Sequence, residues 1–317
     1  MERHRPGTGP DTGPGTGPGT VAGDGERTAP VIGPVPAPGI HVMSWNIRRP
    51  VPPAFTRAAD RWRGRAPALR ALLGAERPTL LCAQEVLGEQ AATVLDGLGR
   101  GFEYIGRGRV SDGGGEACPI FYDTARLDLL GWDQVALSDT PDRPGSVSWG
   151  NLFPRVLVAA HFRDRATGHE WRVVNTHLDP LSRRSRVLSA RAIRSLLGGG
   201  DVLTVVTGDL NAGPADPAVR DLLARGELID SWSAAEHRRT ESWGTYAAYR
   251  EPRRGGTRID WILVTSQVRV TDAAINPRRH EGAWPSDHLP VQAVVRQGNG
   301  RRAGRDPARD EEGGRAT

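Results

Sequence analysis

Between residues 40 and 297 the chain alternates short runs of apolar, β-branched residues with polar loops and a few segments of helical spacing. Short apolar runs that are bounded by Gly, Pro, Asn or Asp are typical of strands. The pattern predicts strands at residues 40–48, 79–85, 102–110, 117–123, 127–137, 155–164, 170–179, 202–210, 258–265 and 290–296.

Helical spacing predicts helices at residues 65–76, 88–99, 183–197 and 215–225. The segment 183–197 has the clearest apolar stripe, and the three glycines at 198–200 end it. Because many strands and several helices share one uninterrupted stretch, we expect layered sheets covered by helices in a single α/β domain over residues 40–297.

Both ends of the chain lack apolar periodicity. Residues 1–39 are rich in Gly, Pro and Thr, and residues 298–317 consist mainly of Arg, Gly, Asp and Glu. Such compositions cannot bury enough surface to offset the entropy of ordering, so both ends are predicted to be disordered tails.

No apolar run is long enough to span a membrane, and residues 1–39 lack the apolar core of a secretory signal. We therefore expect a cytoplasmic monomer without a membrane span. Two cysteines, Cys82 and Cys118, exclude a disulfide framework. The net charge of +5 comes from Arg in a chain without Lys, so it permits a polyanionic partner such as nucleic acid without demonstrating one.

Polar side chains recur where the apolar runs end, which is where an α/β scaffold presents its chemistry. Asn46, Glu85, His177 and Asp179 follow such runs, and so do Asp209 and Asn211 in "VVTGDLNAGP"; Asp260 opens a run, and Asp287 and His288 precede the last one. Taken singly, each has a structural explanation. Glu85 could cap the next helix, His177 could be a buried structural histidine, and "GDLNAGP" could be a simple turn. Together they suit a hard divalent cation and a phosphate group.

Six motifs carry a resemblance to a known family: "SWNIR", "CAQE", "NTHL", "TGDLNAGP", "RIDWIL" and "PSDHLPV". Their order and types resemble the endonuclease/exonuclease/phosphatase superfamily from about Val42 to Val295. The resemblance implies a DNase I-like, four-layer α/β sandwich in which two packed mixed β-sheets are flanked by helices. It also implies a metal-dependent hydrolase of phosphate esters with its active site at one end of the sandwich.

The resemblance assigns the metal and phosphate ligands by position. Glu85 matches the principal metal ligand, Asn46 lies beside it at the metal or phosphate, and Asp287 matches a further metal-site carboxylate. Arg155 resembles an arginine that contacts the phosphate. The implied cofactor is Mg²⁺, with Mn²⁺ as a substitute, and Mg²⁺ prefers such oxygen ligands.

The resemblance also assigns catalytic roles. Asp209 matches the residue that orients or deprotonates the attacking water, and Asn211 matches its partner that holds the phosphate. In an extended segment these two side chains would point to the same side. His288 matches a histidine that stabilises the pentacovalent phosphorane, and Asp260 matches the carboxylate that orients it.

His177 matches a second histidine of the family, which in DNase-like members pairs with a glutamate at the start of a strand. Glu116 is in a corresponding place in "GEACPIFYD", with Tyr122 at the matching aromatic position.

The middle of the chain resembles bacterial members that usually carry Phe-Trp-Leu-Ser where this chain has Val135-Ala136-Leu137-Ser138. This departure either removes a surface for a base or sugar or merely repacks a strand. Three functions compete. The sequence favours a Mg²⁺-dependent nuclease or other phosphodiesterase. A phosphatase or lipid phosphodiesterase for inositol phosphates, sugar phosphates or sphingomyelin would instead need a compact pocket near residues 106–116. A binding module without catalysis is disfavoured because the site motifs are intact.

Overall fold

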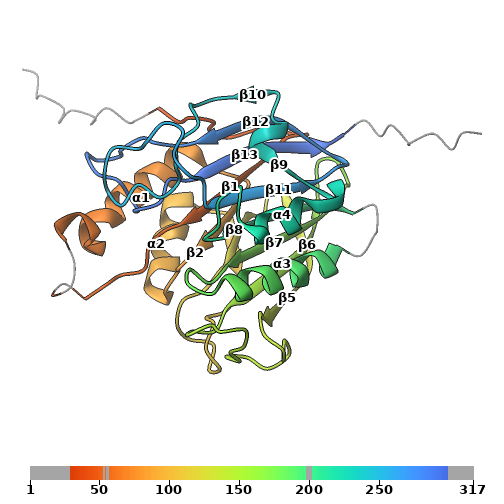
Figure 1. The fold of residues 1–317 in the computed structure, drawn as a ribbon. Coiled ribbons are helices and arrows are strands. Elements are labelled where there is room, and N and C mark those ends of the chain that lie inside the picture. The colour runs from red at the N-terminus through yellow and green to blue at the C-terminus, as the bar shows by residue number, and fades with distance from the viewer. Residues whose placement is uncertain (1–28, 53, 55–56, 198–201, 299–317) are drawn as a thin grey trace, which may run out of the picture.

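The computed structural model describes residues 29–52, 54, 57–197 and 202–298, and it forms two β-sheets packed face to face with helices outside them (Figure 1). The predicted disordered tails at residues 1–28 and 299–317 lie outside the described residues. No helix in the described part of the chain is long and apolar enough to cross a membrane.

The first sheet has seven strands in the order β10-β12-β13-β1-β2-β4-β3. Strands β1 and β2 run parallel, while β1 and β13 run antiparallel. The strand bounds are β1 Ile40–Asn46, β2 Leu80–Gln84, β3 Phe102–Ile105, β4 Ile120–Asp123, β10 His237–Arg238, β12 Val268–Ile275 and β13 Val291–Gln297.

The second sheet has six strands in the order β5-β6-β7-β8-β11-β9. Strands β7 and β8 run parallel, and β11 runs antiparallel to β8. The bounds are β5 Leu127–Ala136, β6 Val156–Asp164, β7 Glu170–His177, β8 Leu203–Asp209, β9 Leu228–Asp230 and β11 Asp260–Thr265. Both sheets are therefore mixed.

The alternation of side chains along each strand builds three apolar layers. One face of each sheet packs against the other sheet, with Val42 and Cys82 facing Val173 and Val205 in one core. The outer face of the first sheet packs against α1 (Trp62–Glu76) and α2 (Gly88–Leu98), and that of the second against α3 (Arg183–Leu197) and α4 (Pro217–Leu223), as Figure 1 shows. The predicted four-layer α/β sandwich is confirmed.

Some predicted elements differ in extent or were missed. The strand predicted at 102–110 ends at Ile105, because Gly106 has a positive φ of 110° that turns the chain away. Strand β12 was not predicted; its alternating pattern breaks at a register shift between Val270 and Asp272. The short β9, β10, α5 (Ser231–Ala234) and the 3-10 turns Ala58–Asp60 and Ala224–Gly226 were also missed.

Residues 29–39 were assigned to the N-terminal tail, and the described structure corrects this. The buried carboxylate of Glu76 accepts hydrogen bonds from the backbone N–H groups of Val31, Ile32 and Gly33 at 2.7–3.1 Å. Asn276 donates to the same carboxylate at 2.9 Å. Composition alone could not reveal this anchor, because the acceptor lies far along the sequence.

Candidate active site

Strand register brings the polar ends of several strands together at one end of the sandwich. His177 at the end of β7 pairs with Asp209 at the end of the parallel β8. Asp260, the first residue of the antiparallel β11, pairs with the same Asp209. In the other sheet, Asn46 ends β1 and Glu85 directly follows β2. The two packed sheets therefore present these side chains along a common edge.

A tight backbone approach positions Asp209. A Cβ built on the preceding Gly208 would lie 2.3 Å from the carbonyl oxygen of Thr176, so only glycine fits there. Asn211 has a φ of 49°, and its backbone N–H donates to Asp209 Oδ1 at 2.9 Å. The segment is thus a turn and not extended as expected, and the Asn211 amide is held by the Leu178 carbonyl at 3.0 Å.

The side-chain amide of Asn46 links the two sheets at the site. Its Nδ2 donates to Glu85 Oε1 at 2.9 Å and to Asp209 Oδ2 at 3.1 Å. Glu85 Oε2 accepts from the backbone N–H of Arg49 at 3.1 Å, and Glu85 has a positive φ of 60°. Helix α2 begins after Leu87, so Glu85 does not cap it. Burial alone would raise the pKa of Glu85. The nearby His177 and these hydrogen bonds outweigh burial and lower this pKa to about 2.

His288 forms a buried pair with Asp260. His288 Nδ1 lies 2.9 Å from Asp260 Oδ2, and the other ring nitrogen lies 3.8 Å from Asp209 Oδ2. Burial alone would lower the pKa of His288, but Asp260 and Asp209 outweigh it and raise the pKa to about 10. The imidazole is therefore a cation near neutral pH, with one N–H directed to Asp260.

His177 differs from His288 in charge. Its Nε2 lies 3.6 Å from Asp209 Oδ2, but burial, aided by Arg155, lowers the pKa of His177 to about 4. Of the two histidines that the sequence analysis places at the site, His288 is therefore charged near neutral pH and His177 is neutral.

Glu116 pairs with arginines. Its carboxylate lies 3.1 Å from Arg49 Nε and 2.9 Å from Arg109 Nη1, and these are its ion pairs within the described part of the chain. The expected pair with His177 is not formed. Tyr122 is also not at the site: it pairs with Leu80 at the opposite end of β2, and its hydroxyl donates to Glu103 at 2.9 Å.

Arg155 is buried just before β6, and some of its N–H groups are unpaired in the described structure. Its Nε and Nη1 have no hydrogen-bond partner within the described residues, and Asp179 Oδ2 lies 3.5 Å from Nε. Buried N–H groups are rarely left unpaired, so this guanidinium is suited to an anion that enters the cleft.

These side chains surround one cleft of about 400 Å³. Asn46 and Asp260 lie beneath it and hydrogen-bond to residues that line it. Exposed apolar side chains stand at its rim, namely Leu152, Phe153, Leu181 and Tyr246. The other predicted residues line the cleft: Glu85, Glu116, Arg155, His177, Asp209, Asn211, Asp287 and His288.

The oxygen ligands at one side of the cleft fit a hard divalent cation. Glu85 and Asp287 are largely buried. Burial raises the pKa of Asp287, and the negative charge of Glu85 raises it further, while His288 and Arg48 lower it. This repulsion between carboxylates is what a bound cation would relieve. Asp209, Asp260 and His288 also lie within 4.8 Å of one another, but a protonated His288 has no free lone pair for a metal.

The family model described as Endonuclease/Exonuclease/phosphatase family matches residues 43–288, which is most of the chain. The protein belongs to the Endonuclease/Exonuclease/phosphatase family. Members of this family hydrolyse phosphate esters, so the protein is a hydrolase acting on phosphate ester bonds. No functionally curated protein matches the chain.

Solved structures of the Endonuclease/Exonuclease/phosphatase family share this fold. A mannosyl-6-phosphatase from Bacteroides thetaiotaomicron is 27% identical, with a TM-score of 0.75 over 81% of this chain and 99% of that chain. The catalytic domain of human Nocturnin, with bound sulfate, is 18% identical, with a TM-score of 0.62 over 82% and 95%. D. rerio TDP2 with a single-strand DNA product is 18% identical, with a TM-score of 0.60 over 82% and 100%. The last two show the fold alone.

Sequence reasoning missed two arginines of this family member. The side chain of Arg48 lies 3.8 Å from Glu85, 3.7 Å from Asp287 and 3.2 Å from Asp60. Arg65 is fully buried in α1, and its position in the apolar stripe with Leu69, Leu72 and Leu73 was the signal that could have revealed it.

Arg65 ties together the loops that carry the site. It donates to the carbonyls of Ile47 at 3.0 Å and Pro285 at 2.9 Å, and also to those of Arg48 and Asp60. The first loop follows Asn46 and the second precedes Asp287. Arg65 therefore fixes the spacing of the two loops that carry Asn46 and Asp287.

Arg65→Leu is expected to lower the free energy of unfolding by about 3 kcal/mol or more, because buried carbonyls lose their charged donor. Arg63 is exposed on the same helix, so Arg63→Leu is the matched control and should change stability by less than about 0.5 kcal/mol. Urea denaturation of both variants measures the difference. Equal stability of the two would show that the buried hydrogen bonds contribute nothing.

Proposed function

We propose that the protein is a Mg²⁺-dependent phosphatase that hydrolyses small phosphate monoesters by direct attack of water. The position of Asp209 carries this proposal. Its carboxylate accepts from Asn46, lies within 3.6 and 3.8 Å of two imidazoles and lines a cleft that also holds Arg155. A base, a cation and anion-binding donors thus converge on one volume, which is what phosphate-ester hydrolysis requires.

Asp209 is proposed to accept a proton from the attacking water. Burial, with the neighbouring Asp260, raises the pKa of Asp209, which makes it a stronger base than an exposed aspartate. The water oxygen forms a bond to phosphorus while the bond from phosphorus to the ester oxygen breaks. The alcohol leaves and takes its proton from solvent, and phosphate is the second product.

Three groups are proposed to hold the phosphate and its developing charge. Arg155 offers unpaired N–H groups, and the amide of Asn211, anchored on Leu178, keeps a second N–H for the phosphate. Protonated His288, held by Asp260, donates from its other ring nitrogen. Donors that are fixed before the reaction stabilise a transition state without reorganisation.

Glu85 and Asp287, with Asn46 beside them, would hold the metal. A bound Mg²⁺ or Mn²⁺ supplies positive charge to the phosphate oxygens and makes phosphorus more electrophilic. Glu116, which the resemblance placed among the catalytic residues, is proposed instead as a positioning group, because it holds Arg49 and Arg109 at the side of the cleft.

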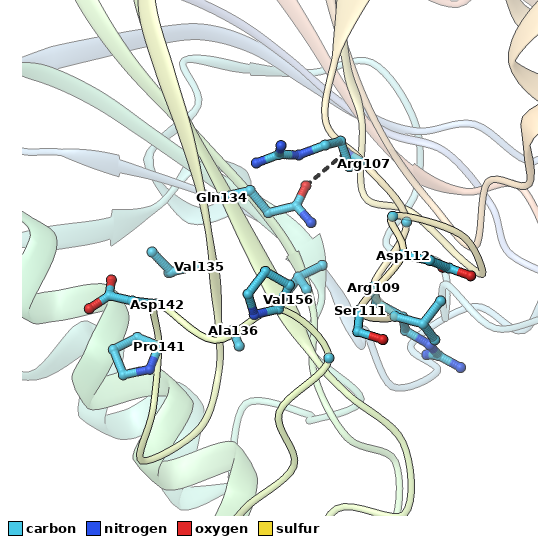
Figure 2. A pocket seen from close by; sticks show the side chains of 15 residues that line it. Arg107, Arg109, Ser111, Asp112, Gln134, Val135, Ala136, Pro141, Asp142 and Val156 are labelled. Carbon is cyan, nitrogen blue, oxygen red and sulfur yellow. Dashed lines mark hydrogen bonds between the residues drawn. The ribbon is translucent and has the colours of Figure 1, made fainter.

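Two observations favour a small substrate. The compact pocket that a phosphatase would need near residues 106–116 is present as a second cavity beside that loop (Figure 2). The 27% identical Bacteroides structure is a mannosyl-6-phosphatase. The nuclease that the sequence favoured is the second candidate, because exposed Phe153 and Tyr246 at the rim of the cleft could stack on bases.

Removal of divalent metal is expected to abolish hydrolysis, and added Mg²⁺ or Mn²⁺ should restore it. The test measures phosphate released from hexose 6-phosphates and shortening of single-stranded DNA and RNA, with EDTA and after metal is restored. Phosphate release from the sugar esters without nucleic acid cleavage supports the phosphatase, and the reverse supports the nuclease. A rate that EDTA leaves unchanged would contradict the metal site.

A further inference from the structure

A cavity of about 180 Å³ lies beside the active-site cleft, between the loop at residues 107–113 and the loop at residues 141–145 (Figure 2). Ala136 and Val156, which pair across β5 and β6, lie between the two loops. Gln134 stands above them and accepts a hydrogen bond from the backbone N–H of Arg107 at 2.8 Å.

Close backbone packing fixes the walls of this cavity. A Cβ built on Gly145, which has a φ of +75°, would lie 2.7 Å from the backbone nitrogen of Ser111. A Cβ on Gly108 would lie 1.9 Å from the carbonyl oxygen of Gly114. The first approach brings the two loops together, and the second folds the loop at residues 107–113 tightly on itself, so neither position accepts a side chain. The cavity opens to solvent between exposed loop residues, so a ligand can reach it.

The lining indicates the chemistry of that ligand. None of the residues that line the cavity is aromatic, so a nucleobase would find no stacking surface. Apolar Ala136 and Val156 suit the C–H face of a ring. The side chains of Ser111 and Asp142 make no hydrogen bond within the described part of the chain, and Gln134 keeps its amide N–H groups. Such groups suit hydroxyls.

Two connections join this cavity to the phosphate site. Arg109 lines both volumes, and its guanidinium reaches Glu116 in the cleft at 2.9 Å. Arg155 lines the cleft and the next residue, Val156, lines the cavity. The backbone at the start of β6 therefore lies between the cleft and the cavity.

We propose that this cavity binds the uncharged, hydroxyl-bearing ring of a sugar phosphate whose phosphate group occupies the cleft, and that Ala136 sets this specificity. The inference rests on the proposed phosphatase function and adds where the alcohol part binds. A large side chain at position 136 would fill the space between the two loops. Ala136 contributes only a methyl group to this part of the lining.

Ala136→Trp tests this proposal, with Ala136→Ser as the matched control that keeps the volume. We expect the ratio of kcat/KM for glucose 6-phosphate and mannose 6-phosphate to that for p-nitrophenyl phosphate to fall about tenfold or more in Ala136→Trp. The loss should come mainly from KM. In Ala136→Ser the ratio should stay within about twofold of the unsubstituted protein.

The outcomes separate the two proposals. If the unsubstituted protein hydrolyses no phosphate monoester with Mg²⁺, the proposed function fails. If it hydrolyses p-nitrophenyl phosphate but not the hexose phosphates, or if Ala136→Trp leaves the ratio unchanged, the phosphatase stands and the ring site is wrong. Thermal unfolding shows whether Ala136→Trp is folded; should it not be, Ala136→Leu fills less of the cavity and must lower the ratio in the same direction.

Discussion

Asp209→Asn is expected to lower the rate of phosphate-ester hydrolysis by about 10²- to 10⁴-fold, because an amide cannot accept the proton of the attacking water. The side chain keeps its shape, so the backbone N–H of Asn211 can still donate to Oδ1. The contact with Asn46 would be lost unless that amide rotates, at a cost of about 1 kcal/mol. The protein should therefore stay folded while it loses activity.

Phosphate release from p-nitrophenyl phosphate with Mg²⁺ measures the effect of Asp209→Asn. Asp96→Asn is the matched control, because Asp96 is an exposed aspartate on α2 with a long ion pair to Arg70 at 3.5 Å. The control should retain full activity. If Asp209→Asn retained most of its activity while folded, another group would have to activate the water.

His288→Gln is expected to slow hydrolysis by about 10²-fold or more, because a fixed cationic donor to the phosphate is removed. Asp260→Asn should give a smaller loss, since Asp260 acts by holding and charging that imidazole. Because Asp260 acts mainly through the imidazole, the loss in the double variant should be clearly smaller than the product of the two single losses.

The steady-state kcat values of the two single variants and the double variant form a double-mutant cycle. His237→Gln on the exposed strand β10 is the control for loss of an imidazole and should leave the rate unchanged. Independent, multiplicative losses from the two substitutions would show that Asp260 does not act through His288, despite the 2.9 Å contact.

The layers of the fold could be predicted from the sequence because the residue types of each strand depend on how deeply that strand is buried. Strand β8 is rich in apolar and β-branched residues and is buried along its whole length, and α3 carries a clear apolar stripe. Strand β12 was missed because a bulge after Val270 breaks the alternation that identifies a strand. The anchoring of residues 31–33 by Glu76 was missed because it depends on a contact between distant parts of the chain.

Part of the candidate site could also be predicted from the sequence, because the strands carry site residues at their ends. Residues placed at strand ends, such as Asn46 and Asp209, meet because register forces them together. The predicted partner of Glu116 and the predicted location of Tyr122 were wrong. The resemblance matched positions in the sequence, but it could not predict which side chains these residues contact in this chain.

The hydrogen bonds between the two sheets could not be predicted, because no local sequence pattern indicates them. Asn175 from β7 donates to the carbonyls of Ala83 and Pro119 in the other sheet at 2.8 and 3.0 Å. Gln84 donates back to Asn175 Oδ1 at 2.8 Å. These buried bonds hold the two halves of the site in place just below the cleft, and they become visible only when both sheets are present.

A crystal structure of Asp209→Asn with Mn²⁺ and mannose 6-phosphate would test the site assignment most directly. We expect one strong anomalous peak for Mn²⁺ at the carboxylates of Glu85 and Asp287, with the phosphate within hydrogen-bonding distance of Arg155, Asn211 and His288. Phosphate bound elsewhere, or a metal held by Asp260 and His288 in place of Glu85, would contradict the proposed chemistry of this cleft.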